Sequence, residues 1–567
     1  MLFKENYRNS KFLKIVLITL SVLLLIIPDL MLHLKKDILS IGVIISKICL
    51  LLAGGLILLR ITKSYYYTYL IIGIPYILSS IAEIVNIIAV NWYISSDGLK
   101  ALYYLSDSEV SEFFGKFKIY FLIPLFLLVG YSLVLVYYKK VFYKVRLKNS
   151  AIIIAFVLML VSIGLTVLKL TENSEFYSGK NRIRLALRSG YIYEHPFNFY
   201  YRTARLFVTN HRNKLSRDLR NNFKFSVSED DKRIKPEVVI FVIGEAMRYK
   251  NWSINGYSKK TSPGLDAFKN LVSYSRHYSN ANCTANAIPL LLTQATAQTY
   301  QDAFHQKTIV SLFKEAGYQT NWISSSSGVL RYLDNREESD FFYNLRTDYP
   351  DNTDYGIIPT VEKVLNQCEG RQFIVINMRG AHERPPLSFD SFTPNSNFKD
   401  YVLSIDNAKV FVNDYDNTIL FQDYILSNVI QRLELQGKSS VFLFTSDHAT
   451  HLFDGGHSLF GYGAAHPTEI ETHIPLFVWC SKKYLNNNKP KFDNMQVNRG
   501  MLSTNDNLFF TLADLANIKY QYFNRNMSLA DSLYIEPESR YVYANNRLFE
   551  FNYKDGSNSL LPSNLSK

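Results

Sequence analysis

Cysteine is scarce in this sequence, with four residues among 567. Cys49 lies in an apolar run, and the other three are Cys283, Cys368 and Cys480. Three cysteines permit one disulfide at most, which excludes a disulfide framework as the source of stability. The nearly 400 residues after position 170 must therefore be held by their own core, and that length is ample for one.

The chain also lacks a small-residue cleavage site after its first apolar run, so this run is not a cleaved signal peptide on its face. Hydrophobic residues make up 48% of the chain, and many of them lie in the first 170 positions. A membrane span needs roughly 20 apolar residues. Five runs reach that length, namely Phe12–Met31, Ile38–Leu59, Tyr69–Trp92, Ile119–Tyr138 and Ala151–Leu170. They predict a bundle of five transmembrane helices.

Lysine and arginine in the short loops predict the orientation of this bundle. The N-terminal segment and the second and fourth loops are basic and should be cytoplasmic, although Lys35 and Lys36 in the first loop oppose this. With five spans, residues 171–567 then lie outside the cytoplasm. The net charge of +13 fits these anchoring loops and an affinity for anionic membrane lipids. Nucleic-acid binding does not suit a membrane-tethered exported domain.

Four ionisable residues of the membrane part invite an interpretation. Lys47 and Glu83 lie inside predicted spans at similar depth, and an isolated charge in lipid is costly. An ion pair between the two helices is one interpretation, and recognition of a lipid headgroup is the other. Glu109 and Glu112 lie three residues apart in the third loop. They are candidate substrate-binding residues for a cationic headgroup, unless the loop is merely a solvated acidic segment.

The pattern along the chain predicts three parts: a transmembrane domain at 1–170, an amphipathic interfacial connector at 171–235 and an exported domain at 236–567. In the last part, fully apolar runs alternate with helical patterns. This alternation predicts an α/β fold with a mainly parallel sheet covered on both faces. The clearest strand runs are Val238–Ile243, Phe373–Met378, Val441–Thr445 and Ile474–Trp479.

Residues that could bind a metal or take part in catalysis follow three of these strand runs. Glu245 follows the first, His382 the second, and Asp447 with His448 the third. Sites in such sheets form at the carboxyl ends of strands, and carboxylates with imidazole are a zinc-type ligand set. Thr284 precedes an apolar, helix-like run. A hydroxyl beside such a cation can attack phosphorus, and a helix amino end favours a phosphate. Taken alone, each of these residues is more often a helix cap or a hydrogen-bonded residue of the core.

Several motifs resemble the membrane-bound phosphoethanolamine transferases of the alkaline-phosphatase/sulfatase-like superfamily. The longest reads GEAMRYKNWSINGYSKKTSPGL and begins at Gly244. The others are Asn413-Asp414-Tyr415-Asp416-Asn417 with Asp423-Tyr424, Ser446-Asp447-His448, Ile474-Pro475 and Asp506-Asn507-Leu508. With the five spans, the resemblance covers nearly the whole chain. It implies a sulfatase-like αβα domain in the periplasm, anchored in a bacterial inner membrane.

The resemblance also implies roles for single residues. Glu245, Asp447 and His448 match zinc ligands, and Thr284 matches the nucleophile, which also contacts the metal. His382 matches a histidine near the phosphoryl group or a second zinc. Thr284 would take phosphoethanolamine from phosphatidylethanolamine and release diacylglycerol. The group would then pass to an outer-leaflet glycolipid or glycan, such as lipid A or the lipopolysaccharide core.

The sequence departs from the family at a few positions. Ala449 and Thr450 stand where Gly and Glu are usual, and Tyr462 stands where a histidine is expected. His457 and His466 are the candidates to replace that histidine near the substrate. Members of the lipid A type often have several disulfides, which this chain cannot form. These changes bear on a second metal site and on lipid A as acceptor, and they leave the first metal site intact.

Three alternatives stand beside this interpretation. A phosphoglycerol transferase of the lipoteichoic-acid-synthase type would share the spans and the threonine but use phosphatidylglycerol and manganese. A sulfatase would need a Cys or Ser in a C/S-x-P-S-R setting, and Cys283 is followed by Thr284, Ala285 and Asn286. A catalytically inactive sensor with the same fold would be consistent with the changes at Ala449, Thr450 and Tyr462.

Overall fold

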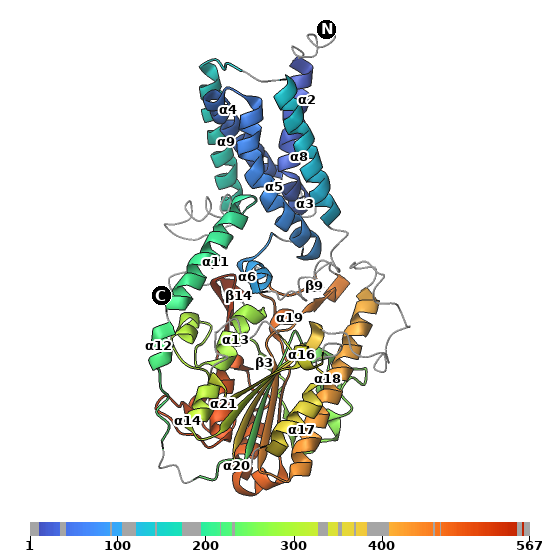
Figure 1. Ribbon diagram of the computed structural model, residues 1–567, viewed down its shortest axis with the longest axis vertical. Helices are drawn as coiled ribbons and strands as arrows, with labels where there is room; N and C mark the ends of the chain where they lie inside the picture. Colours follow the sequence, from blue (N-terminus) through green and yellow to red (C-terminus); the bar gives the residue numbers. More distant parts are fainter. Residues whose placement is uncertain are drawn as a thin grey trace. The chain divides into compact units, whose positions relative to one another are not determined.

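The structure is a computed structural model of the chain. It describes residues 11–33, 41–90, 93–104, 121–141, 145–172, 194–215, 217–228, 233–326, 338–349, 354–367, 370–382, 408–456, 460–464, 466–552 and 558–560. They belong to two compact units (Figure 1). The first falls within Met1–Ser95 and Asp107–Val208, and the second within Ser96–Ser106 and Thr209–Lys567. The three-part division at residues 170 and 235 stays a prediction.

The first unit is built from helices, most of which are apolar. They are α2 (Lys11–Leu25), α3 (Ile27–His33), α4 (Ile41–Thr62), α5 (Tyr65–Val90), α8 (Leu122–Val141), α9 (Ser150–Glu172) and the first part of α11 (Phe197–Leu215). Among the described residues, four stretches are long and apolar enough to cross a membrane: Gly42–Thr62, Tyr65–Ile88, Leu122–Lys139 and Ser150–Leu168. These correspond to the second to fifth predicted spans.

The first predicted span, Phe12–Met31, is not one continuous helix. It divides into α2 and α3 at Ile26, two residues before Pro28. A proline lacks the N–H that would continue the hydrogen-bond ladder of α2. The described apolar part of this region, Ile15–Leu25, is shorter than the four stretches that can span a membrane.

The expected ion pair between Lys47 and Glu83 is wrong. Lys47 instead forms ion pairs with Asp29 of α3 and with Glu194, whose Oε2 lies 2.7 Å from Nζ. Glu83 accepts hydrogen bonds from the backbone N–H of Ile94 at 2.8 Å and from Asn198 at 2.6 Å. Counting residues along a helix fixes depth but not the side of the helix from which a group projects, and here the two groups find different partners.

The second unit is organised around a seven-stranded sheet with the order β2-β10-β7-β1-β6-β4-β5. Its strands are β1 (Val238–Gly244), β2 (Leu271–Ser273), β4 (Gln319–Ser324), β5 (Phe341–Asn344), β6 (Gln372–Asn377), β7 (Ser440–Ser446) and β10 (Leu476–Cys480). β1 pairs in parallel with β6 and β7, and β4 pairs in parallel with β5 and β6. β10 runs antiparallel to both of its neighbours, β7 and β2. The mainly parallel sheet is confirmed.

Both faces of the sheet are buried, which explains why its strands read as continuous apolar runs. Alternate side chains of β1 point to opposite faces, and Val239 and Ile240 belong to different clusters of buried apolar residues. One cluster is completed by α13 (Thr284–Leu292), α14 (Ile309–Glu315), α20 (Lys482–Asn498) and α21 (Leu508–Leu515). The other is completed by α17 (Ile357–Gln367) and α18 (Ala408–Gln436). Figure 1 shows α17 and α18 on one side of the sheet and α13, α14 and α21 on the other.

The remaining described elements of this unit are short. The helices are α6 (Ser96–Tyr104), α12 (Arg217–Asn222), α16 (Leu345–Asp348) and α19 (Glu469–Thr472). The strands are β3 (His277–Tyr278), β8 (His451–Leu452), β9 (Phe460–Gly461), β11 (Ser503–Thr504), β12 (Ser539–Ala544), β13 (Arg547–Asn552) and β14 (Asn558–Leu560). Although α6 comes from the segment between the third and fourth predicted spans, it belongs to the second unit.

Candidate active site and metal centre

The carboxyl ends of β1 and β7 bring the acidic candidates together. The two strands are parallel neighbours, and Gly244 pairs with Ser446 at the last position of the register. Glu245 and Asp447 are the residues that directly follow this pair. Because parallel strands end at the same edge of a sheet, the two carboxylates emerge side by side.

The turn after β1 fixes the direction of Glu245. Ala246 has a positive φ of 57°, so the chain reverses direction immediately after the acid. The N–H of Ala246 donates to Asp447 Oδ1 at 3.2 Å, and the N–H of Met247 donates to Ser446 Oγ at 2.9 Å. Glu245 O accepts from the N–H of Ala381, which belongs to the turn after β6. Three strand ends therefore hold the backbone of Glu245.

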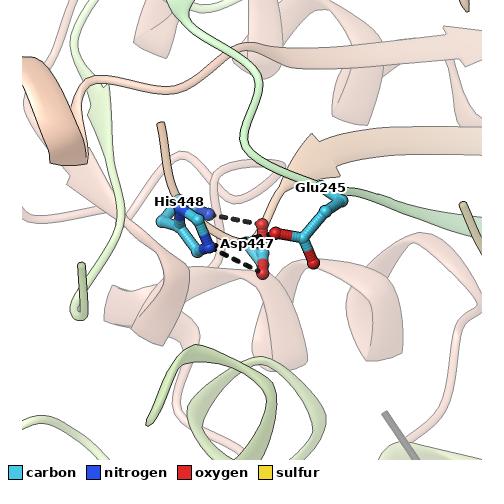
Figure 2. Close-up of side chains that lie close together, drawn as sticks. All are labelled: Glu245, Asp447 and His448. Atoms are coloured by element: carbon cyan, nitrogen blue, oxygen red, sulfur yellow. Dashed lines mark hydrogen bonds and ion pairs between the residues drawn. The ribbon is translucent and has the colours of Figure 1, made fainter. Parts of the chain in front are cut away.

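Glu245, Asp447 and His448 form a buried cluster of potential metal ligands, and one ligand atom from each lies within 4.8 Å of the others. His448 Nε2 lies 3.1 Å from Glu245 Oε1 and 3.4 Å from Asp447 Oδ2. Figure 2 shows the imidazole and the two carboxylates turned toward one another. The structure thus brings together the three residues that the sequence suggested as ligands.

The surroundings of the cluster fit a divalent cation. Asp447 Oδ2 is buried and has no hydrogen-bond partner among the described residues. His448 Nδ1 lies 2.9 Å from Ala449 O, so Nδ1–H donates to this carbonyl and Nε2 is the ring nitrogen that faces Glu245. Zinc-binding histidines commonly donate their second N–H to a carbonyl or carboxylate in this way. Two carboxylate oxygens and one imidazole nitrogen are a donor set that suits zinc.

Electrostatics also favour a positive charge at this position. Burial and the neighbouring Glu245 raise the pKa of Asp447 to about 7. For His448, burial lowers the pKa, but the charges and hydrogen bonds of Asp447 and Glu245 outweigh it and raise the pKa to about 9. Two crowded carboxylates repel each other, and a cation between them removes this penalty.

Thr284 lies beside the same ligand cluster. It is the first residue of α13, and its Oγ1 lies 3.1 Å from both carboxylate oxygens of Glu245 and 3.1 Å from His448 Nε2. The eight residues Ala285–Leu292 that complete the helix are buried, which fixes its axis. The amino end of a helix carries a partial positive charge and favours an anion such as a phosphate. The hydroxyl, the ligand cluster and the helix end converge in one place.

The long motif after Glu245 is held by the side chains of α18. Asp416 is fully buried and accepts from Asn251 at 2.8 Å, from Tyr257 at 2.9 Å and from Lys259 Nζ at 2.6 Å. Two turns further along α18, Asp423 accepts from the N–H groups of Gly264 and Leu265. We call this set of contacts the α18 latch.

Tyr415 is a further residue of α18 that contacts the motif. Its hydroxyl donates to Ala246 O at 2.9 Å and accepts from the N–H of Arg248 at 2.8 Å. The latch therefore reaches the residue directly after Glu245. The sequence singled out the polar residues of α18 only through their resemblance to a family helix, and these contacts give them a physical role.

Asp454 is a charged residue near this motif that the sequence did not reveal. Arg248 Nη2 lies 2.5 Å and Lys250 Nζ 2.6 Å from its Oδ1. Burial opposes the charge, but hydrogen bonds and charges from His451, Arg248 and Lys250 hold the pKa of Asp454 well below its usual range. The ion pairs of Asp454 depend on the turn that follows β8, so the spacing of residues in the sequence did not predict them.

The other predicted site residues are not members of the described ligand group, or their side chains lie outside the described residues. His382 ends the 3-10 helix η9 (Gly380–His382), which follows β6, and its side chain is not among those described. His457, Glu109 and Glu112 lie outside the described residues. His466 is exposed, and its ring lies 5.7 Å from that of Phe549.

Tyr462 occupies a position next to the ligand cluster. Its ring centroid lies 4.1 Å from that of His448. The side chain that stands where the family has a histidine therefore packs against a candidate ligand.

The chain is similar in sequence to known proteins. Residues 237–518 match the sequence profile of the family described as Sulfatase. This part of the chain is therefore similar to that family. Its homologues are phosphoethanolamine transferases, which confirms the resemblance seen in the motifs. One of them, phosphoethanolamine transferase EptA of Escherichia coli K12, is 26% identical over 312 residues, which are 51% of this chain and 55% of that protein.

Solved structures show the same fold. The integral membrane protein lipooligosaccharide phosphoethanolamine transferase A (EptA) from Neisseria meningitidis superimposes with a TM-score of 0.69 at 18% identity, covering 90% of this chain and 98% of that one. The C-terminal periplasmic domain of EptC from Escherichia coli in complex with Zn gives a TM-score of 0.51 at 21% identity, covering 60% and 97%. The sequence match to the curated EptA spans little more than half of its length.

Proposed function

We propose that this protein is an inner-membrane phosphoethanolamine transferase whose catalytic domain faces the periplasm. Its donor is phosphatidylethanolamine, and its acceptor is an envelope glycolipid or glycan. The observation that carries the proposal is the position of Thr284, whose hydroxyl lies 3.1 Å from Glu245 and from His448 at the amino end of α13. Relatives named phosphoethanolamine transferases and four apolar helices support it.

The reaction has two displacement steps at phosphorus. In the first, Thr284 Oγ1 loses its proton and bonds to phosphorus while the bond from phosphorus to the glycerol oxygen breaks. Diacylglycerol leaves with a proton on that oxygen, and phosphoethanolamine remains on Thr284. In the second, a hydroxyl of the acceptor bonds to phosphorus, the bond to Thr284 breaks, and the threonine regains its proton. Covalent catalysis of this kind divides one difficult transfer into two easier ones.

Glu245, Asp447 and His448 would hold a zinc ion, and the zinc complex of the EptC domain supports this choice of metal. When bound, zinc supplies Lewis-acid stabilisation and lowers the pKa of a coordinated hydroxyl. Glu245 and His448 orient the hydroxyl of Thr284, and the first turn of α13 directs N–H groups toward the phosphate oxygens. His382 is proposed to lie near the phosphoryl group, and a second zinc stays a proposal of the same kind.

The test uses the purified full-length protein in vesicles that contain labelled phosphatidylethanolamine. The wild-type protein should release diacylglycerol and carry labelled phosphoethanolamine on the peptide that contains Thr284. Thr284→Ala should lose both signals, and Thr284→Ser should keep part of them because a hydroxyl remains. Diacylglycerol release by Thr284→Ala at the wild-type rate would refute the proposal.

Two further measurements separate the alternatives. Offering labelled phosphatidylglycerol beside phosphatidylethanolamine distinguishes a phosphoglycerol transferase, which would prefer the former. Metal analysis of the purified protein distinguishes an inactive sensor, which would carry no zinc. Mass spectrometry of envelope lipids and glycans, with and without this protein, would identify the acceptor.

A further inference from the structure

A lysine from the segment between two predicted spans reaches the helix of the proposed nucleophile. Lys100 lies on α6, and its Nζ donates to Asn286 Oδ1 at 2.7 Å. Asn286 is the third residue of α13, and Thr284 is the first. At about 1.5 Å rise per residue, the bond is made about 3 Å along the helix from the proposed nucleophile.

The contact is buried on both sides. Lys100 is 7% exposed and Asn286 is fully buried. Lysine is rarely this buried, because removing an ammonium group from water is costly. An ammonium group has only donors, so the amide of Asn286 must present its oxygen to Lys100. The bond therefore fixes the orientation of the Asn286 side chain.

Tyr300 strengthens the same anchor. Its hydroxyl lies 3.3 Å from Asn286 Oδ1 and 3.3 Å from Ala285 O, and the Nζ of Lys100 lies 5.6 Å from the centre of its ring. The ring of Tyr300 stacks on that of Tyr543 at 4.0 Å. The second and third residues of α13 are thus tied to a rigid aromatic pair and to α6.

The other end of α6 is fixed to the same unit. The N–H of Ser96 donates to Asn545 Oδ1 at 2.9 Å, in the turn between β12 and β13. α6 is therefore attached at its amino end and through Lys100, so Lys100 approaches α13 from a supported helix. Figure 1 shows α6 next to α13.

We propose that Lys100 is a positioning residue for the transfer reaction, which acts through Asn286 to hold the first turn of α13 and thereby Thr284. This inference rests on the proposed function, because it concerns the geometry of the same nucleophile. It makes the segment between the third and fourth predicted spans a part of the catalytic apparatus. A nucleophile must be held within a fraction of an ångström of its productive position, and a shift of about 1 Å can cost about a hundredfold in rate.

The test is a double-mutant cycle on the full-length protein in vesicles with labelled phosphatidylethanolamine. Lys100→Met should lower kcat about ten- to a hundredfold and change the KM for the lipid less than about twofold, because it misplaces Thr284 without removing a lipid contact. Asn286→Ala should give a similar loss. The double variant should be no slower than Asn286→Ala alone, since both changes break one link.

Three controls keep the result interpretable. Lys489→Met removes an exposed lysine of α20 that pairs with Asp493, and it should retain the wild-type rate. Lys100→Arg should recover most of the rate lost in Lys100→Met, because arginine can also donate to Asn286. If Lys100→Met is poorly produced, Lys100→Ala replaces it in the same cycle, since alanine also removes the donor to Asn286.

The outcomes separate this inference from the proposed function. Three results would show that Lys100 does not position Thr284. The first is a kcat of Lys100→Met equal to that of Lys489→Met, and the second is a loss of kcat that adds to the loss caused by Asn286→Ala. The third is a raised KM with an unchanged kcat. If Thr284→Ala keeps the wild-type rate, the proposed function falls. An inactive Thr284→Ala together with a fully active Lys100→Met overturns only the role of Lys100.

Discussion

Replacing Gly380 with alanine should disturb the candidate metal centre without changing any of its ligand side chains. Gly380 follows β6 with a φ of +57°, and a Cβ built on it would lie 2.7 Å from Glu245 O and 2.9 Å from Glu245 N. Both neighbours are backbone atoms of a candidate ligand and cannot rotate away. Ordinary contacts to a Cβ begin near 3.4 Å, so the two backbones would have to separate by about 0.7 Å.

The expected size of the effect follows from two contributions. The left-handed backbone conformation costs an alanine about 1 kcal/mol. The forced overlap with a packed backbone adds about 1–3 kcal/mol. Gly380→Ala should therefore lower the free energy of unfolding by about 2–4 kcal/mol. Metal sites tolerate ligand displacements of only about 0.2 Å, so zinc affinity should fall at least about tenfold.

A second glycine provides the matched control. Gly437 has a φ of +61°, but a Cβ added to it would have no atom within 4 Å. Gly437→Ala therefore carries the conformational cost without the overlap and should lose about 1 kcal/mol with unchanged zinc affinity. Denaturant unfolding and competition for zinc with a chromophoric chelator measure the two quantities. Equal losses of stability in the two variants, with the same zinc affinity, would refute the idea that Gly380 is needed for the close approach to Glu245.

Two further predictions concern the latch and the pH dependence. Asp416→Asn should lower the free energy of unfolding by about 2–3 kcal/mol and slow the transfer, because it removes the buried negative charge that pairs with Lys259 and one of the two acceptor oxygens. Asp493→Asn, in an exposed pair, should change stability by less than about 0.5 kcal/mol. Burial lowers the pKa of His277 to about 3. Its unfolded state, with a pKa near 6.5, binds the proton first, so stability is full above about pH 6.5 and falls by about 2 kcal/mol at about pH 5. Unfolding curves of the wild type at several pH values should show this loss of stability. If His277→Asn loses the same stability between about pH 6.5 and about pH 5, the loss comes from other groups.

The sequence predicted the central strands well, because strands that are buried on both faces appear as continuous apolar runs. The run Val238–Ile243 became β1 with one added residue, and Val441–Thr445 became β7 with one added at each end. The apolar runs contain no information on direction, so they did not reveal that β10 is antiparallel. The partners of Lys47 were missed for a related reason, since Asp29 lies beyond the break between α2 and α3.

The site was predictable where strand ends alone determine the position of a side chain. Glu245, Asp447 and His448 follow two adjacent parallel strands, and local spacing was enough to bring them together. The contacts of Asp454 and Lys100 depend on a turn and on a helix from distant parts of the chain. Their neighbours in space are not their neighbours in sequence, and only the structure could show them.

The departure at Ala449 does not weaken the ligand cluster, because the contacts of Ala449 there use the main chain. Ala449 O accepts from Nδ1 of His448, and the N–H of Ala449 donates to Glu471 O at 2.7 Å. Any residue except proline supplies both groups, so a side chain at this position is not needed to orient the imidazole. Tyr462 differs, since its ring lies against His448 and adds bulk where the family has a potential ligand. Loss of the candidate ligands would favour an inactive sensor, and Glu245, Asp447 and His448 instead form a buried cluster.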